Sequence, residues 1–164
     1  MFEIRPAALN EFSLPSSLEE EADAVFATVD PPMDLALFPP AGTVDDFADA
    51  FHIMVAGRPP VGFVRLEIVD GLAHLEQLAV SPDYAGAGIG RSLVEAAKAW
   101  ARESGFHAMT LCTFADVPFN GPFYASCGFT ELATLTPGLA RLRRIERKLG
   151  LDALGRRVVM RAEL

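Results

Sequence analysis

Alternation of apolar and polar residues predicts the strands of this chain. Period-two patterns, or short apolar runs bounded by turn residues, predict strands at residues 2–5, 51–56, 61–69, 72–80, 108–113, 129–135 and 157–162. The connections inside residues 51–80 are short, and the second of them, Asp70-Gly71, is typical of a tight hairpin turn. Residues 51–80 are therefore expected to form three consecutive antiparallel strands.

Apolar residues spaced three and four apart predict the helices. They fall at residues 16–28, 89–104, 119–127 and 139–149. The first begins at Ser16-Ser17, whose hydroxyls can cap a helix, and the second is ended by Gly105. Residues 31–40 are rich in proline and predict a loop, which could shape a substrate pocket or simply connect two elements. We expect one α+β domain over residues 1–164, with a mixed sheet and helices on both of its faces.

Composition narrows the class of protein. The 164 residues are 51% hydrophobic, enough to bury the core of one domain. Neither a run of about 18 apolar residues nor a basic leader is present, so we expect a soluble, cytoplasmic protein without a membrane partner. The net charge of −8 argues against binding nucleic acid, which needs a basic face. Most of the acidic residues precede residue 138. This could favour cationic substrates, but an ordinary solvated surface would have the same pattern.

Cysteines and histidines give few candidates for chemistry. Cys112 and Cys127 lack CxxC spacing and are expected to be reduced and buried. The chain shows no cluster of His, Cys and Asp at ligand spacing, so we predict no metal site. His52 and His107 have no carboxylate partner at a suggestive spacing and are not expected to be catalytic.

A glycine-rich turn follows the predicted strand 72–80. Gly86-Ala87-Gly88-Ile89-Gly90 leads directly into a helix, so backbone N–H groups and the positive end of the helix dipole can form an anion site suited to pyrophosphate. A flexible turn that needs positive φ would have similar glycines. A dinucleotide-binding turn is a second alternative, but it usually lies in the first βαβ unit, whereas antiparallel strands precede this one.

Two segments together resemble a known family. The run from Leu75 to Gly90 closely resembles motif A of the GCN5-related N-acetyltransferase (GNAT) superfamily. The run from Asn120 to Phe129 resembles its motif B, in which an asparagine precedes a tyrosine and a Gly-Phe pair closes a helix. The resemblance implies an α/β/α sandwich with a mostly antiparallel sheet, in which a splayed pair of strands holds acetyl-CoA. The family usually has Arg or Gln where this chain has Ala85, so the backbone must contribute more of the pyrophosphate binding.

The resemblance also implies roles for individual residues. The backbone of Leu78, Ala79 and Val80 would contact the pantetheine arm and thioester. The pyrophosphate would lie against Ala85, Gly86, Ala87, Gly88, Ile89, Gly90, Arg91 and Ser92. Asn120 matches a cofactor-contacting asparagine, although an ordinary helix cap would also explain it. Tyr124 matches the acid that protonates the departing thiolate, although its ring could instead be packing surface with the hydroxyl in solvent.

Acyl transfer to an amine needs a base, because an alkyl amine with a pKa near 10.4 is protonated at pH 7. His74 and Glu76 are two apart on one strand and are expected to project from the same face. Arylalkylamine acetyltransferases have two histidines in a similar Ala-His-Leu-x-x-Leu-Ala-Val run, where this chain has His74 and Glu76. We expect Glu76 to be the base, assisted by His74. Alternatively, Glu76 only orients a cationic substrate, or both residues lie on a solvated face.

These observations favour an acetyl-CoA-dependent N-acetyltransferase. The predicted acceptor is a primary amine of a small molecule or peptide, attacked directly because no activated Ser or Cys is evident. The alternative is a non-catalytic acyl-CoA-binding module that senses or regulates. Arg65 and Glu67 share a strand face and could line the acceptor pocket or form a cross-strand ion pair. The basic helix, with Arg141, Arg143, Arg144, Arg147 and Lys148, could contact a second subunit in a homodimer or face solvent.

Overall fold

A twisted sheet runs through the molecule. The computed structural model describes residues 2–29 and 32–164. In this part of the chain the sheet has seven strands in the order β1-β2-β3-β4-β5-β7-β6. The strands are β1 (Ile4–Pro6), β2 (His52–Ala56), β3 (Gly62–Val69), β4 (Leu72–Val80), β5 (Ala108–Phe114), β6 (Thr130–Glu131) and β7 (Arg157–Glu163). All neighbouring pairs are antiparallel except β4 and β5, so the predicted mixed, mostly antiparallel sheet is confirmed.

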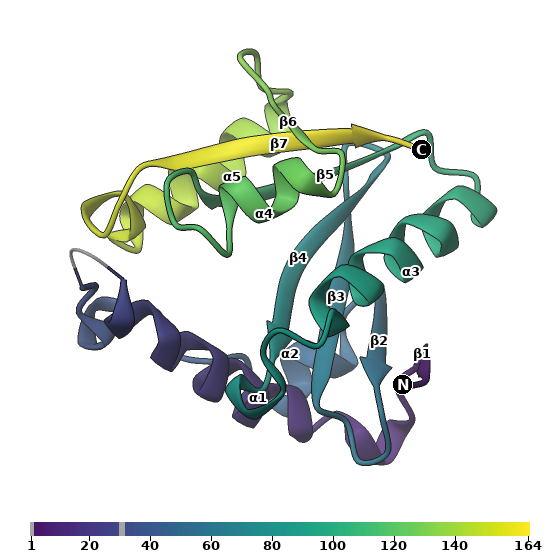
Figure 1. The fold of residues 1–164 in the computed structure, drawn as a ribbon. Helices are drawn as coiled ribbons and strands as arrows, with labels where there is room; N and C mark the ends of the chain where they lie inside the picture. The colour runs from purple at the N-terminus through teal and green to yellow at the C-terminus, as the bar shows by residue number, and fades with distance from the viewer. Residues whose placement is uncertain (1, 30–31) are drawn as a thin grey trace.

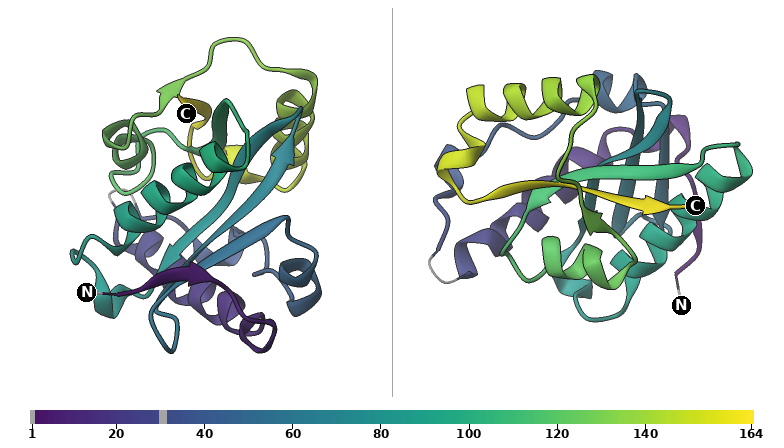
Figure 2. Two further views of the ribbon diagram at one scale, coloured as in Figure 1. Left: turned by 90° about the vertical axis from the view of Figure 1, so that its right-hand side faces the viewer. Right: turned by 90° about the horizontal axis from the view of Figure 1, so that it is seen from above.

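Helices cover both faces of the sheet. The α-helices are α1 (Leu14–Asp23), α2 (Val44–Ala48), α3 (Ile89–Glu103), α4 (Gly121–Ser126) and α5 (Pro137–Lys148). Short 3₁₀ turns are η1 (Leu9–Glu11), η2 (Ala24–Thr28), η3 (Leu35–Leu37), η4 (Pro82–Tyr84) and η5 (Leu151–Ala153). The view from above in Figure 2 shows α5 on one side of the sheet and α3 and α4 on the other. The expected α+β fold with two helical layers is therefore confirmed.

Two apolar cores hold these layers together. The larger core joins α3 to the sheet through fully buried residues such as Leu93, Val94 and Met109. A smaller core lies under α1 and α2, where the rings of Phe47 and Phe63 pack edge to face at 5.5 Å. Burial of apolar side chains on each face fixes which side of every strand points inward.

The sheet splits between its two central strands. β4 and β5 pair only over Ala73–Leu75 and Met109–Leu111, and beyond this point they diverge, as Figure 1 shows. In the pairing of β3 with β4, Arg65 lies opposite Gln77, whereas the next residue of β3, Leu66, lies opposite Leu75. Glu76 is therefore the extra residue of a β-bulge, which bends β4 where it leaves β5.

Several boundaries differ from the sequence prediction. The strand predicted at 129–135 was wrong in length, because only Thr130–Glu131 pairs with β7 within the described chain, as the edge strand β6, and Pro137 soon begins α5. The helix predicted at 16–28 consists of α1 followed by the 3₁₀ turn η2. α2 was missed because five residues are too few to show helical periodicity. Pro31, at the start of the predicted proline-rich loop, lies outside the described residues.

Both cysteines are free, and Cys127 is buried as expected, whereas Cys112 is only half-buried. Among the described helices, none combines the length and apolar character that crossing a bilayer requires.

Candidate active site

Two cavities meet beside the split in the sheet. The turn cavity, of about 630 Å³, lies between the end of β4, the glycine turn, η2 and α4. The carboxylate cavity, of about 420 Å³, lies between β4, β5, α1 and α5 and is lined by Glu19, Asp23, Glu76 and Glu146. The residues that line both cavities form their junction: Asp23, Phe26, Leu78, Ala79, Asn120 and Tyr124. A molecule that spans the junction could place one group in each cavity.

The split in the sheet exposes part of β4 to these cavities. Leu78 and Ala79 pair with β3 on one side, while β5 has already diverged on the other. In an antiparallel pair, alternate residues direct their N–H and C=O groups away from the partner strand. The free edge of β4 at Leu78–Val80 can therefore hydrogen-bond an extended ligand.

The glycine turn has the backbone shape that the sequence indicated. Gly86 and Gly88 have φ values of 78° and 79°, in the left-handed region that favours glycine. A Cβ at either position would meet nothing within 4 Å, so backbone conformation rather than space requires glycine there. α3 begins at Ile89, within the turn and directly after Gly88, so its first unpaired N–H groups lie at the cavity.

Most of the predicted cofactor residues border the turn cavity. All of them belong to the described chain, and those that line it are Leu78, Ala79, Val80, Ala85, Gly86, Gly88, Ile89, Gly90, Arg91 and Asn120. Ala87 and Ser92 are not part of this lining, and the Ser92 N–H already donates to the Gly88 carbonyl at 3.0 Å. Sequence reasoning missed the aromatic wall formed by Phe26, Phe119 and Phe123. Phe26 and Phe119 come from a 3₁₀ turn and a loop without a motif, and Phe123 lies in the motif B run but had no predicted role.

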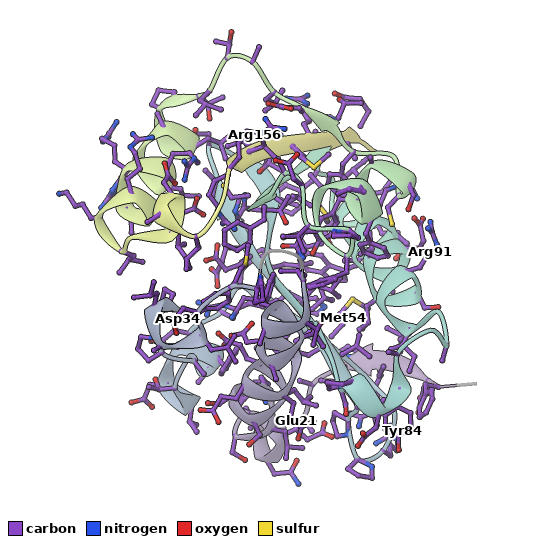
Figure 3. The ribbon with its side chains drawn as sticks, turned by 60° about the vertical axis from the view of Figure 1, so that its left-hand side comes forward. Glu21, Asp34, Met54, Tyr84, Arg91 and Arg156 are labelled. Carbon is purple, nitrogen blue, oxygen red and sulfur yellow. The ribbon has the colours of Figure 1, made fainter. Side chains whose placement is uncertain are left out.

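The Arg91 side chain contacts residues of α4. Its guanidinium donates to the Ser126 carbonyl at 3.2 Å and to the Ser126 hydroxyl at 2.7 Å, and it lies over the ring of Phe123. Figure 3 shows this side chain beside α4. Arg91 therefore links the start of α3 to α4 and stiffens the wall of the turn cavity.

His74 and Glu76 come together in the carboxylate cavity. His74 Nε2 lies 3.6 Å from Glu76 Oε2, and His74 Nδ1 lies 2.7 Å from the hydroxyl oxygen of Thr110 on β5. The His74 side chain is only 2% exposed, and burial lowers its pKa to about 4, so it is neutral at pH 7. Thr110 carried no signal in the sequence, because its contact depends on the short parallel pairing of β4 with β5.

Glu76 sits at the β-bulge with its side chain 39% exposed to the cavity. Burial raises the pKa of this carboxyl, and the nearby Arg65 opposes the rise. Arg65 lines the same cavity and pairs at 3.0 Å with Glu67 of its own strand β3, so the expected cross-strand ion pair was wrong, and a place in the acceptor pocket stays a prediction. A carboxylate with a raised pKa beside a neutral histidine is suited to accept a proton near neutral pH.

An ion-pair network from α5 closes the far side of the carboxylate cavity. Glu146 pairs with Arg143 and, at 2.7 Å, with Arg157, and Arg143 also pairs with Asp152 at 2.7 Å. Arg143 is buried in the interior, so neither exposure to solvent nor contact with a second subunit, the two alternatives for the basic helix, applies to it. Arg141, Arg144, Arg147 and Lys148 are exposed, and contact with a second subunit stays a prediction for them.

Tyr124 and Asn120 reach the junction from α4. Tyr124 is 8% exposed and packs edge to face with Phe123 and Phe129, so its hydroxyl is not in bulk solvent. Burial raises the pKa of its phenol, which stays protonated at pH 7. Asn120 is the N-cap residue of α4, but its side chain makes no capping hydrogen bond there. Its amide is therefore free to contact a ligand.

The split sheet, the left-handed glycine turn and the two joined cavities define an acyltransferase of the kind that the sequence resemblance implied. Residues 16–129, more than half of the chain, match the model of the Acetyltransferase (GNAT) family. The protein therefore belongs to the GNAT acetyltransferase family. This membership confirms the expected enzyme class and its acetyl-CoA donor.

Solved structures share the fold along the whole chain. The PaiA N-acetyltransferase from Thermoplasma acidophilum, in complex with coenzyme A, is 14% identical, with a TM-score of 0.70 over 100% of this chain and 99% of that one. Rv2747 from Mycobacterium tuberculosis, in complex with CoA and NLQ, is 20% identical, with a TM-score of 0.69 over 99% of both chains. The ribosomal-protein-S18-alanine N-acetyltransferase from Escherichia coli is 20% identical, with a TM-score of 0.68 over 99% of this chain and 94% of that one.

Proposed function

We propose that this acetyltransferase transfers the acetyl group of acetyl-CoA to a primary amine of a small molecule or peptide, by direct attack of the amine on the thioester. The observation that carries the proposal is the junction at Leu78, Ala79 and Tyr124, where a cavity beside an anion-binding turn meets a cavity lined by carboxylates. A donor in the first cavity and an acceptor in the second would meet at this junction.

The turn cavity fits the donor. N–H groups of the glycine turn and of the first turn of α3 are available for a pyrophosphate, and the positive end of the helix dipole adds to the attraction. Ala85 offers no polar side chain and Arg91 is engaged with Ser126, so backbone groups would supply most of the phosphate contacts. The free edge of β4 at Leu78–Val80 would hydrogen-bond the pantetheine arm and place the thioester at the junction.

Glu76 would act as the base. The acceptor amine must lose a proton when its nitrogen bonds to the acetyl carbonyl carbon, and the Glu76 carboxylate can take that proton directly or through water. Neutral His74, held by Thr110 at 2.7 Å, would keep its Nε2 toward Glu76 and orient the carboxylate. The raised pKa of Glu76 suits this carboxylate to accept a proton from the amine near neutral pH.

Tyr124 would act as the acid. When the C–S bond breaks, the leaving sulfur gains a negative charge, and a neutral phenol can donate its proton or a hydrogen bond to that sulfur. Tyr124 lies at the junction and is protonated at pH 7, which meets both requirements.

Cys112 supports direct attack over a covalent acyl-enzyme. It lines the carboxylate cavity, but burial raises the pKa of its thiol to about 12, so almost none of it is the nucleophilic thiolate at pH 7.

The proposal is tested by measuring thiol release from acetyl-CoA with a panel of aliphatic, aromatic and peptide amines. With an accepted amine, we expect Glu76→Gln to lower kcat about 10²-fold or more, while KM for acetyl-CoA changes less than about threefold. Wild-type kcat should rise with pH as Glu76 ionises, through a pKa above that of an ordinary glutamate, and the variant should lack this rise.

Glu95→Gln is the matched control. Glu95 is exposed on α3 and lies away from both cavities, so this substitution removes the same charge without touching the site. An unchanged pH–rate profile in Glu76→Gln would remove Glu76 as the base. Binding of acetyl-CoA without thiol release with any amine would instead support the non-catalytic sensor.

A further inference from the structure

Asp23 is the charged residue at the junction of the two cavities. Among the described residues that line both of them, it alone carries a formal charge at neutral pH, the others being Phe26, Leu78, Ala79, Asn120 and Tyr124. Asp23 is the last residue of α1, a helix that packs on β3 and β4. It therefore approaches the junction from α1, whereas Glu76 comes from β4.

The carboxylate of Asp23 lacks a compensating charge within the described chain. It forms no ion pair there, and it does not cap the following turn η2 although it occupies the N-cap position. The two arginines that line the carboxylate cavity, Arg65 and Arg157, are already paired with Glu67 and Glu146. A carboxylate at the C-terminal end of a helix is unfavourable, because the dipole there is negative.

The surroundings of Asp23 make its charge costly. The residue is half-buried, and burial, together with Glu19 and Glu20 on the same helix, raises the pKa of Asp23 to about 6. A half-buried carboxylate without a partner is a site that a cationic ligand would stabilise, because the ligand would supply the missing charge. The position of the carboxylate at the junction means that such a cation would lie beside the thioester.

We propose that Asp23 binds the protonated amine of the incoming acceptor at the junction and thereby makes the enzyme selective for acceptors that arrive as ammonium ions. This inference rests on the proposed function and adds a specificity-determining residue to it. Asp23 would hold the ammonium group next to the thioester, and Glu76, from β4, would then remove the proton. Aromatic amines, which are neutral at pH 7, would gain nothing from Asp23.

The test compares n-butylamine, which is charged at pH 7, with aniline, which is neutral. We expect Asp23→Asn to raise KM for n-butylamine about tenfold, the effect of losing one hydrogen bond to a charged group, while kcat changes less than about threefold. KM for aniline and KM for acetyl-CoA should stay within about twofold. Asp23→Glu, which keeps the charge, should restore most of the affinity for n-butylamine.

Glu21→Gln is the matched control on the same helix. Glu21 is exposed on α1 and belongs to neither cavity lining, so its loss should leave both amines unaffected (Figure 3). Equal increases of KM for n-butylamine and aniline in Asp23→Asn would overturn the proposal, as would a fall in kcat with unchanged KM, since that would make Asp23 the base.

Binding is measured separately from turnover. In the CoA-saturated protein, amide chemical shifts on titration with n-butylamine should give a Kd about tenfold weaker in Asp23→Asn than in the wild type. Binding that depends on Asp23 without thiol release would support the ammonium site and contradict the acetyltransfer. Thiol release with Asp23-independent binding would support the acetyltransfer and overturn the ammonium site.

Discussion

His74 and Tyr124 lie in the interior, where burial disfavours the charged form of each side chain. For histidine the charged form is the protonated one, so its pKa falls, whereas for tyrosine it is the deprotonated one, so its pKa rises. Both side chains are consequently neutral at pH 7. In the proposed reaction they would orient the base and protonate the leaving group, while Glu76 and Asp23 are the carboxylates that act on the amine.

Removing the Tyr124 hydroxyl tests the acid. In Tyr124→Phe we expect kcat to fall about 10²-fold, because the thiolate would leave without a proton donor. The ring packing on Phe123 and Phe129 is preserved, so Tm and the Kd of acetyl-CoA, measured by calorimetry, should change little. Unchanged turnover at saturating acetyl-CoA would exclude Tyr124 as the acid.

His74 should make stability depend on pH. Its pKa is about 4 in the folded chain and 6.5 in a free histidine, so acid protonates the unfolded chain first. The stability that neutral His74 contributes is fully present above pH 6.5 and is lost as the pH falls towards 4, by about 1.4 kcal/mol per pH unit.

Urea unfolding at pH 7, 6, 5 and 4 measures this loss. Between pH 6.5 and 4, the free energy of unfolding of the wild type should fall by about 3 kcal/mol more than that of His74→Gln, in which this titration is absent. The variant is the reference because Glu11, whose pKa lies at about 2, and other carboxyls titrate in both proteins. Parallel curves for the two proteins would show that His74 is not buried in its neutral form.

At the scale of elements, a substitution in the glycine turn should have two effects that can be measured separately, one on stability and one on acetyl-CoA binding. In Gly88→Ala we expect a loss of stability of about 1 kcal/mol, since alanine disfavours φ near +79°, and a weakening of acetyl-CoA binding of tenfold or more as the N–H groups move. Differential calorimetry and titration with acetyl-CoA measure the two effects.

Gly71→Ala is the control for this turn. Gly71 resembles Gly88, because its φ is +77° and a Cβ added there would meet open space. Unlike Gly88, it lies in the β3–β4 hairpin, away from the turn cavity. The variant should therefore lose similar stability and bind acetyl-CoA normally. Normal binding in Gly88→Ala as well would mean that the phosphates lie elsewhere.

The β-bulge and α5 are the elements that complete the carboxylate cavity. The bulge at Glu76 bends β4 and places its side chain opposite the space that β5 leaves. α5 adds Glu146, whose pairs with Arg143 and Arg157 close the wall. Neither contribution follows from local sequence, because a bulge depends on the register with β3, and α5 is far from β4 along the chain.

At the scale of the whole molecule, the split sheet places the proposed base and the proposed acid on its two different parts. β4 supplies Glu76 and the free strand edge, while the part that contains β5 and β7 carries α4 with Asn120 and Tyr124 (Figure 1). The two parts are joined by the short pairing of Ala73–Leu75 with Met109–Leu111 and by helix packing. The spacing between Glu76 and Tyr124 is consequently a property of the fold.

The sequence by itself determined the fold class, the three antiparallel strands, the glycine turn with α3 and the pair His74 and Glu76. These features depend on local periodicity, on glycines such as Gly88 that readily adopt a left-handed backbone, and on two motifs with recognisable spacing. Tertiary structure decided the rest: the partner Thr110 of His74, the internal role of Arg143, and the position of Asp23 at the junction. The positions of Thr110 and Asp23 depend on contacts between segments far apart in the chain, and Arg143 depends on its nearby partners Glu146 and Asp152 being folded inward. Packing of the whole sheet and its helices sets this geometry and leaves no periodic signal in the sequence.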